Sequence, residues 1–316
     1  MGPGLFGYMV RRLLWAIPVL FAISVMVFVM LRLTPGDPVD RILGQRYDPV
    51  VAARLRSKYG YDEPVYVQYG KYLQNLAHGD LGVSTLHTDF SARDVIAPKL
   101  WVSTQIAFWA LLITFSLGIP IGVYAALARG TPLDPMTISF WLFLDAIPTF
   151  VLTTFCSWLF ALKLGLVGLG YEGVYSSHMI MPVLIMGVPG VAGVARFMRA
   201  SVLSVLGEDY IRTARAKGLK EQTVVISHIA RNAMMPMITV IGLSLPGLAA
   251  GSLFVEQAFG IPGIARESLA AATAPDYDVI LALVLLGSVL FVMANVFIDI
   301  AYAYIDPRVR VGAARG

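Results

Sequence analysis

The segment Glu208–Pro236 is a charged stretch between two long apolar segments, and its residue types suit binding rather than catalysis. Two acids, Glu208 and Asp209, stand where a helix N-terminus favours negative charge. Good helix formers follow from Arg212 to Lys217, and Gly218 suits the first position beyond a helix. The pattern predicts a short helix of about ten residues, too polar to enter a bilayer.

One face of this predicted helix has the properties of a docking surface. Tyr210, Ala214 and Lys217 share that face at i, i+4 and i+7 spacing. Small Ala214 and Ala216 would let the wall of a groove approach the backbone, with Tyr210 as an aromatic anchor. The alternative is an ordinary amphipathic connector resting on lipid headgroups. A second helix is expected over Glu221–Ala233.

Sequence motifs for catalysis or metal binding are absent. No Gly-Lys pair is followed by Ser or Thr, so the sequence has no phosphate-binding loop for nucleotide hydrolysis. Neither H-E-x-x-H nor G-x-S-x-G occurs. The histidines are scattered at positions 78, 87, 178 and 228. We therefore assign no catalytic residue, no metal ligand and no cofactor to this chain.

Asp145 is the one acid placed well inside an apolar stretch, three residues before Pro148. Ionisable residues at such depth are functional candidates by default. Asp145 could line a pathway and meet a substrate amine. It could equally satisfy backbone groups freed by the proline. Both interpretations remain open from the sequence.

The composition indicates a polytopic membrane protein. Of 316 residues, 57% are hydrophobic and only 14% are charged, whereas soluble domains carry about 25% charged residues. The net charge of +4 is typical of Lys and Arg placed beside membrane spans, an interpretation that we prefer to nucleic-acid binding. The single cysteine, Cys156, cannot form an intrachain disulfide.

Six stretches are long and apolar enough to cross a hydrocarbon core of roughly 30 Å, which takes about 20 residues. They are Leu13–Leu31, Leu100–Ala128, Pro135–Leu162, Met179–Ala195, Ala233–Val255 and Val279–Ile298. In the fourth, Gly187, Gly190 and Gly193 are expected to allow close helix–helix approach. The fold class is therefore all-α, a multi-pass protein with six transmembrane helices.

The distribution of Lys and Arg predicts the orientation. If both termini are cytoplasmic, the two short external loops hold only Lys163 and Arg266. The long external loop 33–99 is of mixed charge. It opens with a turn at Thr34–Pro38, and short helices are expected over Val50–Tyr59 and, with an aromatic face, Tyr66–Leu76.

A family resemblance rests on several segments. Asp209–Leu219, DYIRTARAKGL, with HIARNAMMP after it, resembles the Glu-Ala-Ala loop of permease subunits from binding-protein-dependent ABC importers, in its dipeptide/oligopeptide (peptide/nickel) form. YMVRRLLWAIPVLFAISVMVF, DEPVYVQYGKYL, VEQAFGIPGIARESL and IDIAYAYIDPRVR also resemble that branch, in the expected order. One departure is that Arg212-Thr213-Ala214 occupies the Glu-Ala-Ala positions, so only Ala214 and Gly218 match.

The resemblance implies a type I ABC importer permease fold whose cytoplasmic coupling helix sits in a cleft of an ATPase. The implied contact residues are Glu208, Asp209, Tyr210, Arg212, Ala214, Ala216, Lys217 and Gly218. The implied partners are a homologous second permease, two cytoplasmic ATP-binding subunits that hold ATP and Mg, and an extracytoplasmic binding protein. Peptides are the expected cargo, and the location is a prokaryotic cytoplasmic (inner) membrane. The chain itself is then not an enzyme, and Glu256–Arg266 caps the pore mouth.

The expected organisation has four parts. They are an N-terminal segment with the first span (1–32), the external loop (33–99), a five-helix permease core (100–310) that includes the coupling loop (201–235), and a tail (311–316). Two other functions stay open. The cargo could be nickel or another small solute, or the chain could be a stand-alone ion-coupled carrier. A carrier needs several intramembrane ionisable groups, and only Asp145 is well inside.

Overall fold

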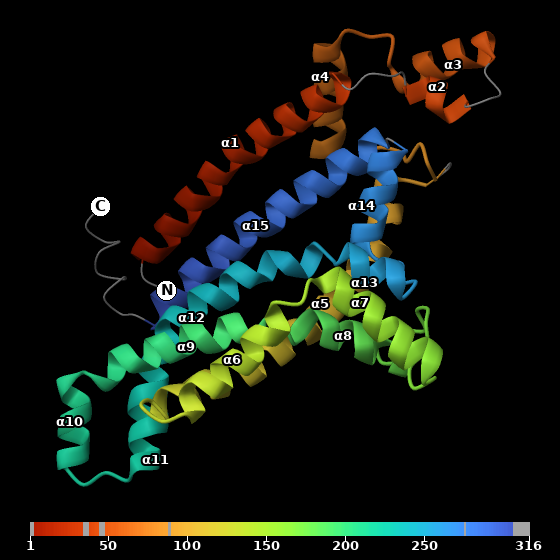
Figure 1. The fold of residues 1–316 in the computed structure, drawn as a ribbon. Coiled ribbons are helices and arrows are strands. Elements are labelled where there is room, and N and C mark those ends of the chain that lie inside the picture. Colours follow the sequence, from red (N-terminus) through yellow and green to blue (C-terminus); the bar gives the residue numbers. More distant parts are fainter. Residues whose placement is uncertain (1–2, 34–37, 44–47, 88–89, 275, 306–316) are drawn as a thin grey trace.

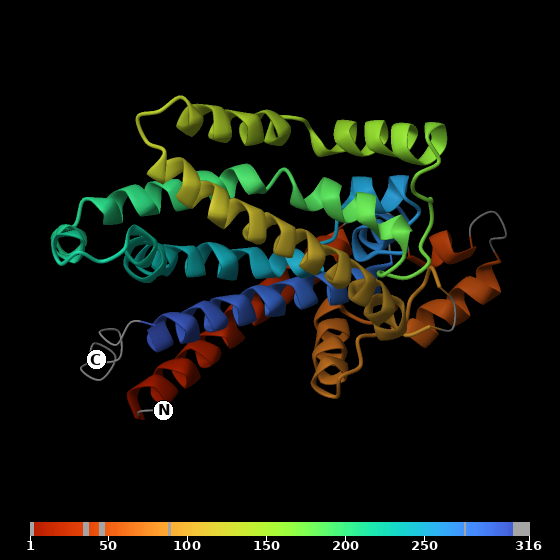
Figure 2. The same cartoon turned by 90° about the horizontal axis from the view of Figure 1, so that it is seen from below.

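The computed structural model describes residues 3–33, 38–43, 48–87, 90–274 and 276–305. Within these ranges all regular secondary structure is helical apart from one isolated β-bridge between Val83 and Ser91. The all-α prediction is confirmed. Neighbouring helices pack in a stack (Figure 2): α1 lies beside α15 at one edge, and α6 and α7 lie at the other.

In the described part of the chain, four continuous helical runs are long and apolar enough to cross a membrane. The runs consist of α1 (Pro3–Leu33), α5 (Ala92–Leu127), α15 (Tyr277–Ile305), and a composite helix made of α11 (Glu221–Thr223), a π-helical stretch (Val224–Ala230), α12 (Arg231–Ser244) and a 3₁₀ turn (Leu245–Ala249). Each covers most or all of a predicted span because uncharged apolar residues fill its central turns.

Two further spans are broken. The first consists of α6 (Leu133–Asp145) and α7 (Thr149–Cys156), which continues as a π-helical turn (Ser157–Lys163), with an 80° bend between its halves. The second joins a 3₁₀ turn (Ser177–Met179) and α8 (Ile180–Gly187) to α9 (Val191–Leu206), with a bend of 47°. A proline lies in each break, at Pro148 and Pro189, where it disfavours helix in the residue before it. Counting each pair as one span gives the six that the sequence predicts.

The predicted fifth span is wrong at its far end. The helix begins at Glu221, passes through Pro236 and ends at Ala249, so Glu221–Ala233 is not a separate helix. Beyond it Gly251 adopts a positive φ of 65°, and α13 (Leu253–Ala258) is a separate helix. Hydropathy alone did not reveal this break, because the residues on both sides of Gly251 are equally apolar.

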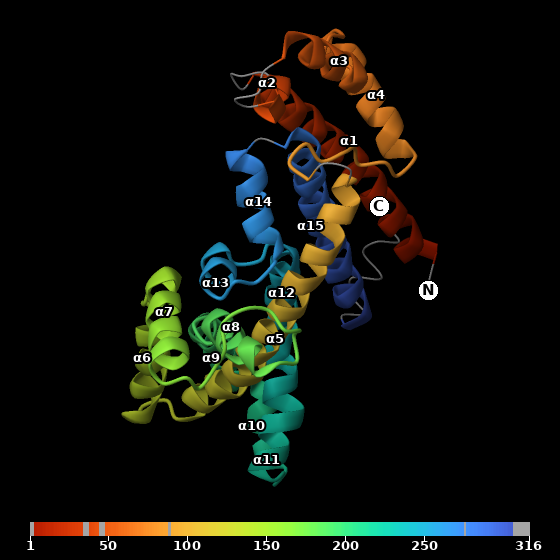
Figure 3. The ribbon, with the colours of Figure 1, turned by 90° about the vertical axis from the view of Figure 1, so that its right-hand side faces the viewer.

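Short helices lie at the end of the bundle opposite α10 (Asp209–Ala216), as Figure 3 shows. They are α2 (Pro38–Leu43), α3 (Pro49–Tyr59) and α4 (Val65–Ala77), followed much later in the chain by α14 (Ile264–Thr273). The helices expected over Val50–Tyr59 and Tyr66–Leu76 are confirmed as α3 and α4. The turn expected at Thr34–Pro38 lies almost wholly outside the described residues.

The centre of the bundle depends on close packing between α5 and its neighbours α8 and α9. A Cβ atom on Gly122 would lie 2.5 Å from the carbonyl oxygen of Ala195, and one on Gly187 would lie 2.6 Å from that of Ala110. The expected role of Gly187 is confirmed. Gly193 has no neighbour within 4 Å of such an atom, so its expected packing role is wrong.

This packing predicts that Gly122→Ala destabilises the protein, because backbone lines one side of the contact and cannot rotate away. We expect a loss of about 1–3 kcal/mol in the free energy of unfolding, seen as a lower melting temperature in detergent. Gly193→Ala, also in a helix, is the matched control and should be neutral or slightly stabilising. Equal melting temperatures for the two variants would contradict the packing argument.

Candidate functional site

The helix predicted in the charged segment is α10, which runs from Asp209 to Ala216. Glu208 precedes it with extended backbone geometry. At the other end Gly218 has φ +75°, and its N–H donates to the carbonyl of Arg215 at 2.9 Å. A short helix that ends at Gly218 is therefore confirmed, with eight residues rather than ten.

The two faces of α10 have different surroundings. Ile211 and Ala214 are buried against Val202, Val224 and Ile229 in one hydrophobic cluster. Of the predicted contact residues, the exposed ones are Glu208, Asp209, Tyr210, Arg212, Ala216, Lys217 and Gly218. Tyr210 and Lys217 therefore do not share an outward face with Ala214. The small size of Ala214 serves packing inside the chain, where only 6% of the residue is exposed.

Polar contacts hold α10 against the next helix to form a hairpin, which projects from the bundle in Figure 1. Arg215 makes two hydrogen bonds to the carboxylate of Glu221, from Nη2 at 2.6 Å and from Nε at 3.2 Å. Partial burial raises the pKa of Tyr210 and so does the charge of Glu208, while a hydrogen bond with Asn232 opposes them. The hairpin is a braced element with a charged outer surface.

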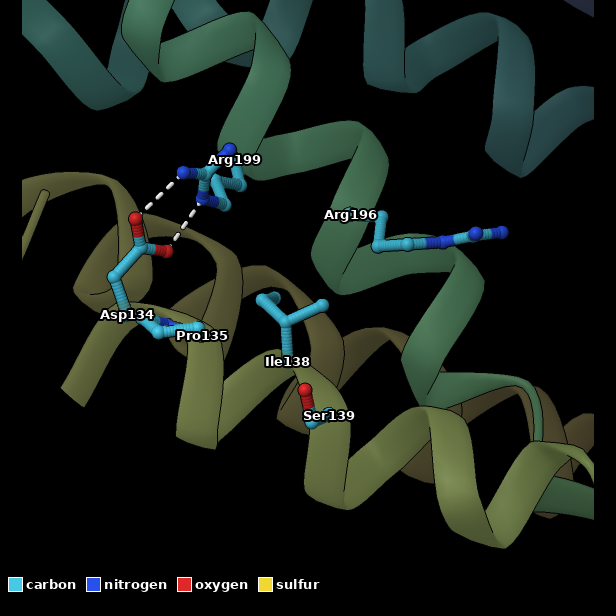
Figure 4. A pocket seen from close by; sticks show the side chains of 6 residues that line it. All are labelled: Asp134, Pro135, Ile138, Ser139, Arg196 and Arg199. Atoms are coloured by element: carbon cyan, nitrogen blue, oxygen red, sulfur yellow. Dashed lines mark hydrogen bonds and ion pairs between the residues drawn. The ribbon is translucent and has the colours of Figure 1, made fainter. Parts of the chain in front are cut away.

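The helix that leads into this hairpin, α9, is tied to the broken span α6–α7. Nε and Nη2 of Arg199 each donate to one oxygen of Asp134 at 2.6 Å, and the Asp134 side chain is only 9% exposed. Figure 4 shows this pair at one end of a cavity of about 380 Å³ between α6 and α9. Sequence reasoning missed the pair because the partners lie 65 residues apart, beyond any spacing rule.

Asp145 is the last residue of α6, at the 80° bend. Its side chain is exposed, and within the described part of the chain it has no hydrogen bond or ion pair. The backbone around the bend is satisfied without it, since the N–H of Ala146 bonds to Leu142 at 2.9 Å and that of Ile147 to Leu144 at 3.4 Å. The structure gives no support to the backbone-capping interpretation.

The segment Glu256–Arg266 folds against α5 through one buried carboxylate. Glu256 is 2% exposed, accepts hydrogen bonds from Ser103 Oγ at 2.7 Å and from the N–H of Arg266 at 2.9 Å, and leaves no room for a side chain at Gly251 or Gly263. Burial raises the pKa of Glu256, while these hydrogen bonds lower it. The segment is thus a fixed part of the structure. The sequence shows these glycines and Glu256, but it gives no sign that the glycines pack against the carboxylate.

A second acidic residue fixes the same end of the bundle. Glu267 in α14 accepts from His87 Nε2 at 2.9 Å and from Lys99 Nζ. Among the described residues no group of three or more His, Cys, Asp or Glu side chains could hold a metal ion. Glu267 therefore ties α14 to α5 and to the loop before it.

Comparison with known proteins shows the family to which this chain belongs. The model of the binding-protein-dependent transport system inner membrane component matches residues 118–311, and the model of the N-terminal part of such membrane components matches residues 5–91. The chain belongs to this family of transport permeases. The resemblance to permease subunits of binding-protein-dependent importers is thus confirmed.

Two relatives match the permease along nearly its whole length. The oligopeptide transport system permease protein of Haemophilus influenzae is 37% identical over 304 residues, 96% of this chain and 99% of the relative. The glutathione transport system permease protein of Shigella flexneri is 38% identical over 307 residues, 96% of this chain and 98% of the relative.

Solved structures support the fold of the permease. The methionine ABC transporter MetNI in inward-facing conformations matches with a TM-score of 0.56 at 16% identity, covering 67% of this chain and 96% of the other. An amino acid ABC transporter with histidines matches with a TM-score of 0.52 at 14% identity, covering 67% and 94%. The type I ABC importer permease fold is thereby confirmed.

Proposed function

We propose that the chain is one of two permease subunits of an importer that carries di- and oligopeptides into a prokaryotic cell through its cytoplasmic (inner) membrane, with both termini in the cytoplasm. The observation that carries this proposal is the full-length similarity to permeases named for oligopeptides and for glutathione, itself a small peptide. ATP and Mg are bound by two separate subunits, and an extracytoplasmic binding protein delivers the cargo. A nickel or other small-solute importer is not favoured by these relatives, and a stand-alone carrier is not favoured by the family.

The proposed contact with the ATP-binding subunits is the exposed surface of the α10 hairpin. It is formed by Glu208, Asp209, Tyr210, Arg212, Ala216, Lys217 and Gly218, without the buried Ala214. A short, braced helix with an aromatic side chain suits insertion into a groove of a partner. At Gly218 no atom lies within 4 Å of the position of a Cβ, which leaves its backbone open to close approach.

Movement of the hairpin reaches the broken span through α9. The chain leaves α9 at Leu206 and enters α10 only three residues later, at Asp209. Because Arg199 of α9 is bonded to Asp134 of α6, a displacement of α9 is passed to α6. The bend after Asp145 is the point at which α6 can then reorient against α7. We assign the change between outward and inward access to this route.

Asp145 is the proposed contact with cargo in the pathway between the two permease subunits. Its free carboxylate lies at the C-terminal end of α6, where the helix dipole adds partial negative charge. Both favour a cation, and the α-ammonium group of a peptide is one. Aromatic side chains exposed on both sides of the bend, Phe143 and Phe150, offer apolar surface for the rest of a peptide.

The docking proposal predicts that Arg212→Glu releases the ATP-binding subunits. Arg212 has a side chain 76% exposed, and its ion pair with Asp209, whose side chain is 95% exposed, lies at the surface. The change therefore reverses a surface charge and leaves the buried face of the hairpin intact. We expect at least a tenfold drop in the ATP-binding subunits that co-purify with the permease, at unchanged membrane insertion. Arg93→Glu, an exposed arginine at the opposite end of the bundle, is the control. Equal recovery of the subunits with both variants would rule out this surface.

The cargo proposal predicts that Asp145→Asn lowers uptake of cationic peptides more than that of neutral ones. The charge lost is worth about 1 kcal/mol or more at a partly hydrated site, so we expect a several-fold difference between the two cargo classes. Uptake by the reconstituted complex measures it, with Asp94→Asn on the exposed start of α5 as control. An equal effect on both classes would assign Asp145 a structural role.

A further inference from the structure

A polar crevice of about 260 Å³ lies between α1, α3, α4 and the start of α15. It is separate from the α10 hairpin and from the bend at Asp145, which belong to other helices. Tyr59, Tyr61 and Tyr72 line it together with side chains of both charges. Nothing in the proposed transport route uses these groups.

Three buried polar atoms of this crevice have no hydrogen-bond partner among the residues that the structure describes. They are Oε2 of Glu63, Oε1 of Gln68 and the hydroxyl of Tyr72. The other carboxylate oxygen of Glu63 is paired with Lys71 Nζ at 2.6 Å, and Gln68 Nε2 donates to the carbonyl of Glu63 at 2.6 Å. The unused positions are thus two acceptors and one hydroxyl. Because unpaired buried polar groups cost free energy, such a set calls for a ligand that donates several hydrogen bonds.

The charges of the crevice call for a ligand that carries both signs. Asp80 and Asp278 add negative charge to that of Glu63, whereas Arg32 and Lys58 are cationic. The guanidinium of Arg32 is held over the rings of Phe28 and Tyr61, at 5.2 and 4.8 Å from their centroids. A zwitterion with an ammonium and an anionic group fits this lining better than an ion of one sign.

The crevice lies at the level of lipid headgroups. Arg32 is in the last turn of the α1 span, which ends at Leu33, and Asp278 is the second residue of the α15 span. These span ends are at the side of the bundle away from α10, beside the surface helices (Figure 1). Tyrosines and cationic side chains are typical of this interfacial layer.

We propose that the crevice binds the headgroup of a phosphatidylethanolamine molecule, with its ammonium on Glu63, Gln68 and Tyr72 and its phosphate towards Arg32 and Lys58. The unpartnered oxygens select ethanolamine over choline, because a trimethylammonium group has no N–H to donate. Bound lipid would fasten α4 to α1 and α15.

Native mass spectrometry of the purified complex tests the proposal. The wild type should retain one phosphatidylethanolamine per copy of this chain after delipidation. Tyr72→Phe and Glu63→Gln should each lower its apparent affinity roughly tenfold, as expected for a hydrogen bond to a charged group. The matched controls, Tyr66→Phe on the same helix and Asp62→Asn next to Glu63, are exposed and should retain the lipid.

A second measurement needs no variant. Titration of the wild type with ethanolamine lipid and its mono-, di- and trimethylated forms should show affinity that falls with each methyl group. Equal affinity for all four, no retained lipid, or equal retention by test and control variants would overturn the proposal. If the Tyr72 and Glu63 variants weaken docking of the binding protein but not lipid retention, the crevice receives a protein side chain and the lipid proposal is wrong.

Discussion

The bidentate ion pair between Arg199 and Asp134 is the interaction on which the proposed mechanism depends. It joins the two broken spans, one of which leads into the α10 hairpin while the other contains the unpaired Asp145. Two parallel hydrogen bonds to a largely buried carboxylate resist both sliding and rotation of the helices. In the proposed mechanism each helix therefore follows the other at this point, and reorientation takes place at the bends.

Contacts elsewhere in the molecule determine which parts of the bundle stay rigid in the proposed movement. The glycine contacts of α5 fix α8 and α9 at short range, and the Arg215–Glu221 pair braces the hairpin. At the far end, buried Glu256 and Glu267 hold the surface segments on α5. The molecule thus combines stiff packing at its centre and both ends with two proline-containing breaks. That is the arrangement expected of a subunit that transmits movement.

Local features of the sequence predicted much of this structure. Features that depend on contacts between distant segments could not be predicted from it. Hydropathy located all six spans, and the two acids at the start of α10 together with Gly218 after it located that helix. Which face of α10 is buried depends on Val224 and Ile229, so the inward position of Ala214 was not predictable. The Asp134–Arg199 pair was also not predictable, because it too depends on how distant helices pack. The expectation for Gly193 failed because small residues permit close approach without requiring it.

The most direct test of the proposed mechanism is to change the Asp134–Arg199 pair and to measure how tightly transport remains coupled to ATP hydrolysis. In the reconstituted complex, Asp134→Arg and Arg199→Asp singly should leave ATP hydrolysis largely intact while peptide transported per ATP falls about tenfold or more, as expected when a buried pair is broken. The double variant, which restores the pair with reversed charges, should recover most of the coupling. Unchanged coupling in the single variants, or equal loss in the double variant, would contradict the account.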